Sequence, residues 1–130
     1  MPSVTTPTED KIHGIEIAKY LDIEHAEIGI DSILNEFLDV THLEENNLAI
    51  GNLKARIRMS IIYYFANHKN YLVSGTGNKS EILIVYFTKH GDGACDMEPI
   101  GDLYKTDVYK LSEFMGIPQG IIESRRAPAY

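Results

Sequence analysis

The chain has 130 residues, the size of one ordinary domain, and 44% of them are hydrophobic, which is enough for a single core. A net charge of −7 and the lack of a basic stripe argue against nucleic acid as a partner. One cysteine, Cys95, excludes an intramolecular disulfide, and the longest apolar runs are too short to span a bilayer. We therefore expect a cytoplasmic protein that binds neither nucleic acid nor membrane.

The first part of the chain predicts two helices around one short strand. Residues 6–9 (Thr-Pro-Thr-Glu) have the form of a capping box with proline at the first helical position. Apolar residues then recur along a helix that ends near Asp22. Residues 25–30 alternate in polarity as a strand does, and Asp31 or Ser32 can cap a second helix.

The middle of the chain predicts the longest helix and a strand–turn–helix unit. Residues 46–67 contain no proline and have a dense helical pattern of apolar residues. Residues 71–74 form a short apolar run that predicts a buried strand, and residues 75–78 (Gly-Thr-Gly-Asn) predict a tight turn. Residues 79–87 then predict a helix, and residues 88–100 predict an irregular loop.

The order of these elements indicates an α/β fold with parallel strands joined by crossovers. Thr106 can cap a last helix that reaches Met115 and stops at Gly116. Only two strands are visible, and two parallel strands do not form a stable sheet alone. The sequence therefore looks like a piece of a larger domain.

The segment 72–81 (Leu-Val-Ser-Gly-Thr-Gly-Asn-Lys-Ser-Glu) carries the clearest chemistry. A strand, a glycine turn and a helix start together point backbone N–H groups at an anion. Thr76 adds a hydroxyl donor, and Glu81 could hold Mg²⁺ beside bound phosphates. Taken alone, the segment favours a simpler interpretation, a plain turn in which Glu81 complements the helix dipole.

Other charged residues allow two interpretations each. Arg56 and Arg58 lie two positions apart on the predicted long helix and so face different directions; one can bind a phosphate, or both line an amphipathic surface. Asp92 and Asp96 lie in a long loop that is either functional or simply solvated. Lys105 can bind a phosphate or be a surface lysine.

Four segments, in this order, resemble the NAD synthetase family. They are 51–59 (Gly-Asn-Leu-Lys-Ala-Arg-Ile-Arg-Met), 74–81, 87–96 (Phe-Thr-Lys-His-Gly-Asp-Gly-Ala-Cys-Asp) and 99–106 (Pro-Ile-Gly-Asp-Leu-Tyr-Lys-Thr). Each segment alone is a weak signal, but four in register are specific. The resemblance implies a Rossmann-like parallel sheet of the adenine nucleotide alpha hydrolase type, incomplete in this chain. Residues 1–130 would then form part of the NAD synthetase domain.

The resemblance also implies a reaction and its partners. The family converts nicotinic acid adenine dinucleotide (deamido-NAD) to NAD: ATP, with Mg²⁺, adenylates the nicotinate carboxylate, and ammonia then displaces AMP. Members are homodimers, and we expect residues 46–67 to form the dimer contact. The resemblance assigns each candidate residue to one ligand. The assigned residues are Arg56, Lys89 and Asp96 for deamido-NAD, Thr76 and Lys105 for ATP, and Glu81 for Mg²⁺.

Three departures from the family pattern leave two alternatives open. The family's Ser-Gly-Gly-x-Asp-Ser loop is absent and is expected before Met1, and the family's C-terminal His-Lys pair is absent and is expected after Tyr130. In addition, residues 127–129 (Ala-Pro-Ala) stand where the family usually has Pro-Ser/Thr-Ala. We therefore expect these 130 residues alone to be inactive. The alternatives are a non-catalytic, nucleotide-binding or dimerising remnant and another ATP-pyrophosphatase-type amidotransferase. The latter would share the missing loop but not the Lys-Ala-Arg and Thr-Lys-x-Gly-Asp-Gly segments.

Overall fold

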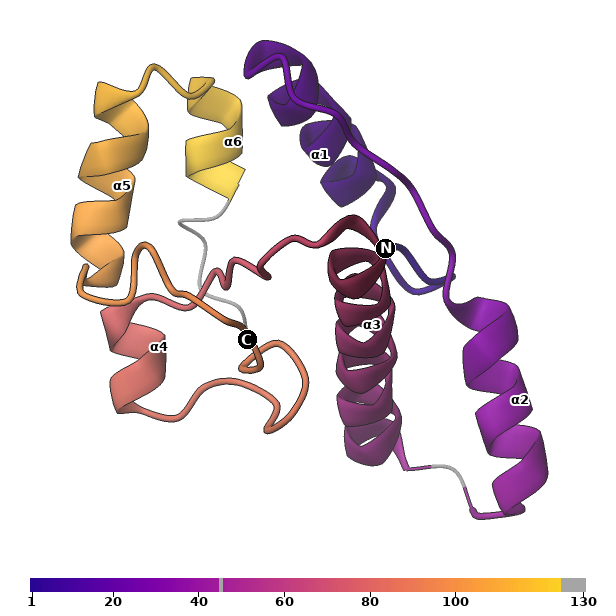
Figure 1. The fold of residues 1–130 in the computed structure, drawn as a ribbon. Coiled ribbons are helices and arrows are strands. Elements are labelled where there is room, and N and C mark those ends of the chain that lie inside the picture. Colours follow the sequence, from indigo (N-terminus) through magenta and orange to yellow (C-terminus); the bar gives the residue numbers. More distant parts are fainter. Residues whose placement is uncertain (45, 125–130) are drawn as a thin grey trace.

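The computed structural model describes residues 1–44 and 46–124, so the departure at Ala127–Ala129 lies outside the described residues. Helices are the regular elements of these ranges (Figure 1). They are α1 (Thr8–Tyr20), α2 (Asp31–Thr41), α3 (Asn47–Lys69), α4 (Lys79–Leu83), α5 (Lys105–Phe114) and α6 (Gln119–Ser124). No helix in the described ranges is long and apolar enough to cross a bilayer.

The helices form two groups joined by the extended segment that follows α3 (Figure 1). In the first group α2 packs along α3, and in the second α5 packs against both α4 and α6. The core lies between α2 and α3, where Ile30, Leu34 and Ile57 are buried together. Other large apolar side chains stay exposed, including Leu48 at 76% and Leu72 at 72%.

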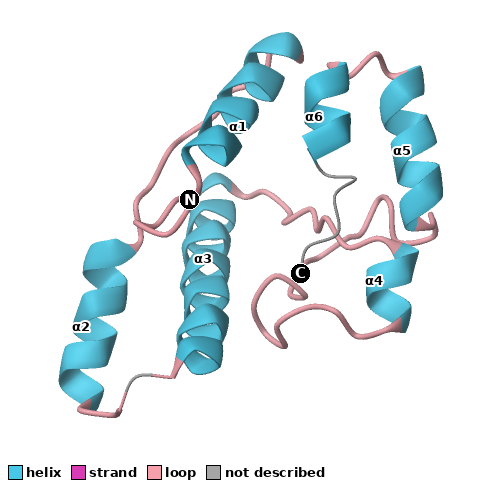
Figure 2. Ribbon diagram, turned by 180° about the vertical axis from the view of Figure 1, so that it is seen from behind, coloured by secondary structure: helices cyan, strands magenta, loops and turns pink. Residues whose placement is uncertain are grey.

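The two predicted strands are not confirmed in the described part of the chain (Figure 2). Residues 71–74 contribute one isolated parallel bridge, between Ser74 and Met97. In the predicted strand 25–30, Ile30 N donates to Pro2 O at 3.1 Å, but no strand ladder forms with the described residues. A strand exists only through the ladder it forms with a partner backbone. Without that partner, the expected parallel sheet is absent from residues 1–44 and 46–124.

The longest predicted helix is confirmed, and local caps explain both of its ends. The Oδ1 atom of Asn46 accepts a hydrogen bond from the backbone N–H of Ala49 at 3.0 Å. At the other end Asn70 adopts a left-handed conformation with φ of 56°. The next predicted helix, 79–87, is too long, because α4 ends at Leu83. A β-branched pair, Ile84 and Val85, follows it and disfavours a helix.

Three predicted helix caps are wrong: two of the side chains accept hydrogen bonds from backbone N–H groups outside the helices, and the third lies inside its helix. Thr6 Oγ1 accepts a hydrogen bond from Ser3 N at 2.9 Å, and α1 has no side-chain cap. Asp31 Oδ1 accepts from Val4 N at 3.0 Å, and α2 also lacks a side-chain cap. Helix α5 begins one residue before Thr106, again without a side-chain cap. The first two side chains instead hold the loop that precedes α1.

Candidate functional site

The glycine turn at residues 75–77 is held tightly against the loop that follows α4. Gly75 N donates to Met97 O at 2.7 Å, and a Cβ atom at Gly75 would lie 2.6 Å from Cys95 Sγ. A Cβ atom at Gly77 would lie 3.1 Å from Glu98 Oε1. Glycine is therefore required by close packing on one side of the turn. Between the two glycines, Thr76 keeps an exposed side chain.

A reciprocal cap fixes Glu81 in the first turn of α4. Asn78, only 3% exposed, accepts a hydrogen bond from Glu81 N at 3.1 Å through Oδ1. Glu81 Oε2 in return accepts from Asn78 N at 3.2 Å. The two contacts form a capping box, which satisfies two backbone donors at the helix start. The cap thus leaves the other carboxylate oxygen, Oε1, for a further partner.

That partner is Lys105, which lies at the start of α5. Its Nζ lies 3.0 Å from Glu81 Oε1, and its backbone N donates to Ser80 Oγ at 3.1 Å. Desolvation opposes the charged form of Glu81, but the Lys105 ammonium and the Asn78 amide outweigh it and lower the pKa of the carboxyl group. Lys105, expected to bind ATP, and Glu81, expected to bind Mg²⁺, therefore form an ion pair that joins α4 to α5.

Two of the residues expected to bind deamido-NAD also meet. Arg56 Nε donates to the backbone O of Lys89 at 3.2 Å, while both side chains remain exposed. Thr88 Oγ1 donates to Asn52 Oδ1 at 2.8 Å, and a Cβ atom at Gly91 would come within 2.9 Å of α3. These contacts fix the loop directly on α3. The site therefore spans elements more than thirty residues apart in sequence.

The third residue of that set, Asp96, binds the protein itself through both carboxylate oxygens. Oδ2 accepts a hydrogen bond from Val73 N at 2.7 Å, and Oδ1 accepts from the Tyr63 hydroxyl at 3.2 Å. Asp96 thereby joins α3, the segment before the glycine turn and the loop after α4. It is not among the residues that line the cavities described next.

Two cavities meet at Thr76. One, of about 50 Å³, is lined by Thr76, Glu81 and Asp92 among others. The second, of about 290 Å³, lies between α3 and the glycine turn and is lined by Thr76, Asp92, Arg58 and Tyr63 among others. Thr76 therefore lies where a ligand could reach both α4 and α3. Of the two arginines of α3, Arg58 and not Arg56 lines the larger cavity.

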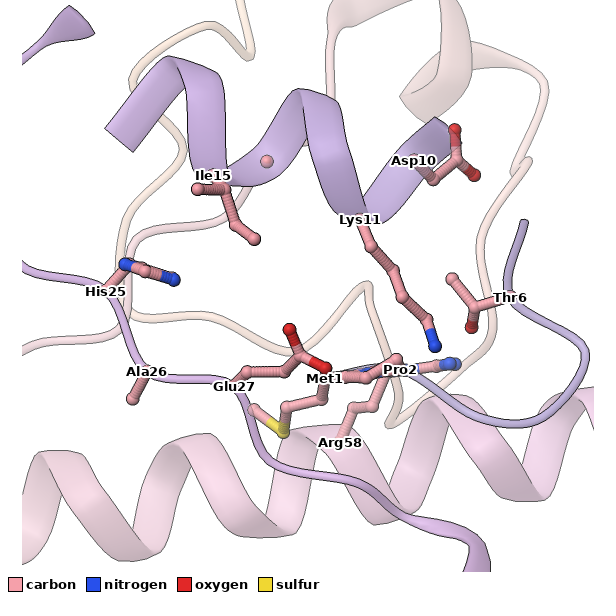
Figure 3. A pocket seen from close by; sticks show the side chains of 11 residues that line it. Met1, Pro2, Thr6, Asp10, Lys11, Ile15, His25, Ala26, Glu27 and Arg58 are labelled. Carbon is pink, nitrogen blue, oxygen red and sulfur yellow. The ribbon is translucent and has the colours of Figure 1, made fainter. Parts of the chain in front are cut away.

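Arg58 also lines a third cavity, of about 260 Å³, on the side of α1 (Figure 3). Its Nε donates to the backbone O of Met1 at 2.9 Å. Lys11 extends from α1 into this cavity, and Glu27 reaches it from the extended segment before α2 (Figure 3). Arg58 thus separates two cavities, one beside the glycine turn and one beneath α1.

Similarity to known proteins shows which family the chain belongs to. The family model described as NAD synthase matches residues 1–129. The chain belongs to the NAD synthase family. It is 46% identical, over 99% of its length and 47% of the relative's, to an NH(3)-dependent NAD(+) synthetase of Sulfurisphaera tokodaii. It is 50% identical to the corresponding protein of Methanocaldococcus jannaschii, over 95% of this chain and 49% of that one.

A solved structure has a similar arrangement of backbone. The structure of NMN synthetase from Francisella tularensis superposes with a TM-score of 0.89 at 36% identity, covering 93% of this chain and 51% of that chain. The chain thus spans about half the length of the relatives it matches. The chain therefore shares their family, but it matches only about half of the chain that carries their activity.

Sequence reasoning did not assign three residues that belong to this candidate site. Asn78 was assigned only to a turn, although Asn-x-x-Glu before a helix is a recognisable capping pattern. Tyr63 contacts Asp96, 33 positions away, and no sequence signal marks that contact. Arg58 could not be distinguished from Arg56, because helix direction relative to a cavity depends on tertiary packing.

Proposed function

We propose that the protein amidates deamido-NAD to NAD with ammonia and ATP, through an adenylated intermediate. One observation supports this most directly: the residues assigned to ATP and Mg²⁺ converge. Thr76 and Glu81 line one cavity, and Lys105 Nζ lies 3.0 Å from Glu81 Oε1. Because a free carboxylate is a poor acyl donor, adenylation is the step that turns its oxygen into a good leaving group, AMP, which ammonia then displaces.

In this proposal the glycine turn holds the triphosphate of ATP. The Thr76 hydroxyl would donate to a phosphate, and Lys105 would leave Glu81 to neutralise phosphate charge. Mg²⁺ in nucleotide enzymes takes one or two carboxylates together with phosphate oxygens. The described residues contain no group of three or more His, Cys, Asp or Glu that could hold a metal alone. Glu81 fits a metal ion that arrives bound to ATP. The positive charge of that ion would stabilise the phosphates.

Deamido-NAD would lie across α3 and the loop after α4. Arg56 Nε binds the backbone O of Lys89, and both side chains are exposed, so each cation is accessible to an anionic ligand. Asp96 would complete the set on the other side of the loop. ATP and deamido-NAD are intracellular metabolites, and we accordingly propose a cytoplasmic location.

The complete fold and its assembly are also proposals. We propose that the segments 25–30 and 71–74 belong to a Rossmann-like parallel sheet of the adenine nucleotide alpha hydrolase type when the whole domain is present. We further propose a homodimer through residues 46–67. Leu48 and Phe65, which are 76% and 45% exposed on α3, support such a contact. Light scattering should report a dimer, and Leu48→Asp should reduce it to a monomer if the contact is correct.

Ammonia is the nitrogen donor favoured by the relatives at 46% and 50% identity, both of which carry NH(3)-dependent names. A second candidate substrate comes from the NMN synthetase relative at a TM-score of 0.89. Its name suggests that the nicotinate group could be carried by a mononucleotide. The two substrates differ in the adenylate half, so comparing the affinity of the chain for each distinguishes them.

Binding measurements on the full chain test the proposal. Isothermal titration calorimetry should detect Mg²⁺–ATP and deamido-NAD as separate ligands. Thr76→Val should weaken ATP about tenfold, the loss of one hydrogen bond to a charged group, and leave deamido-NAD unchanged. Arg56→Gln should do the reverse. Lys110→Gln, on the exposed surface of α5, is the control and should alter neither. If the wild-type chain failed to bind Mg²⁺–ATP, or failed to bind deamido-NAD, the proposed site for that ligand would be contradicted.

A further inference from the structure

Asp96 forms a two-point contact with Val73 that imitates pairing between strands. Its backbone N donates to Val73 O at 2.9 Å, and its Oδ2 accepts from Val73 N at 2.7 Å. The carboxylate thus replaces the backbone carbonyl that a neighbouring strand would offer. Gly75 N continues the contact by donating to Met97 O at 2.7 Å. The position of the glycine turn therefore depends on how Asp96 is oriented.

Tyr63 determines that orientation from α3. Its hydroxyl donates to Asp96 Oδ1 at 3.2 Å, across 33 residues of sequence. Desolvation, the hydrogen bond to Asp96 and the charge of Asp96 together raise the pKa of the phenol, in agreement with a hydroxyl that donates to a carboxylate. Tyr63 also lines the 290 Å³ cavity together with Thr76. Tyr63 thus contacts the loop after α4 through Asp96 and also faces the 290 Å³ cavity.

We propose that Tyr63 is a positioning residue for deamido-NAD binding, acting through Asp96. The inference rests on the proposed function, in which Asp96 contacts this ligand. An ionised carboxylate offers about four acceptor positions, and protein donors use two of those on Asp96. The Tyr63 hydroxyl fixes the rotamer of Asp96 and so directs the remaining positions toward a hydroxyl or N–H donor of the ligand. A tyrosine that only fills space would not need its hydroxyl.

The test compares two neighbouring tyrosines of α3. Tyr63→Phe removes the hydroxyl and keeps the ring, whereas Tyr64→Phe makes the same change at a side chain that is 71% exposed. Calorimetry on the full chain should give about tenfold weaker binding of deamido-NAD for Tyr63→Phe, because Asp96 then lacks the hydrogen bond that orients it before the ligand binds. Binding of Mg²⁺–ATP should be unchanged, and Tyr64→Phe should match the wild type for both ligands.

Equal deamido-NAD affinity of the two variants would overturn the proposal, and so would a parallel loss of ATP affinity, which would indicate general damage to the fold. A second measurement does not depend on ligand binding. In Asp96→Asn, NMR titration should show the pKa of the Tyr63 phenol falling toward its ordinary value of 10.0. An unchanged titration would overturn the contact itself. Failure of the wild type to bind deamido-NAD, with the titration shifted as expected, would reject the proposed function and with it the ligand role of Tyr63.

Discussion

The ion pair between Glu81 and Lys105 allows a quantitative test of how α4 and α5 are joined. The perturbation is Glu81→Gln, because a glutamine oxygen can still accept from Asn78 N and so preserves the cap. What it removes is the charge that faces Lys105. The Glu81 side chain is 28% exposed and that of Lys105 48%, so the pair is neither buried nor fully solvated.

The magnitude follows from this partial exposure. Exposed ion pairs contribute about 0.2–1 kcal/mol, and the upper end applies here because the carboxylate is mostly shielded from water. A double-mutant cycle of Glu81→Gln with Lys105→Gln should therefore give a coupling of about 1 kcal/mol in the free energy of unfolding. The pair Lys110–Asp107, at 2.9 Å with exposures of 76% and 42%, is the matched control. Its coupling should be about 0.3 kcal/mol.

The lowered pKa of Glu81 determines in which direction the coupling changes with pH. Because the folded protein lowers the pKa of Glu81, the stabilisation is fully present above the ordinary value of 4.5 and is lost as the pH falls through the lowered value. Urea unfolding at about pH 7, followed by steps downward through the acid range, should show the coupling vanish at the acid end. A coupling no larger than that of the control pair, or one that is constant with pH, would refute the reasoning.

Three further outcomes are expected from urea unfolding and thiol chemistry. Gly51→Ala should stabilise α3 by up to about 1 kcal/mol, since nothing lies within 4 Å of the added Cβ; a loss of stability would contradict this. Gly91→Ala should destabilise by about 1–3 kcal/mol, because its Cβ would meet Ala55 Cβ at 2.9 Å; a neutral result would show that the loop can shift. Burial and Glu98 raise the pKa of the Cys95 thiol, so iodoacetamide at neutral pH should react slowly with it, and Glu98→Gln should speed the reaction; equal rates would argue against that contact.

Elements with local causes were predictable from the sequence. Helix α3 has an asparagine at each end and a dense apolar pattern between, and both its existence and its limits follow from residues close in the chain. The glycine turn was equally predictable, since glycine and a following asparagine specify their own backbone geometry. Helix α4 was overextended because the apolar pattern continues through residues that are exposed; Ile84, for example, is 72% exposed and buries little to hold another turn.

The sequence by itself thus determined the family, the long helix and the residue types of the candidate site. Only tertiary structure decided which of these residues meet: Lys105 with Glu81 across 24 residues, and Tyr63 with Asp96 across 33. It also decided that residues 25–30 and 71–74 do not form a sheet in the described ranges. The physical reason is common to both: a strand or an ion pair needs a partner brought from elsewhere in the chain, whereas a cap or a turn needs only its neighbours.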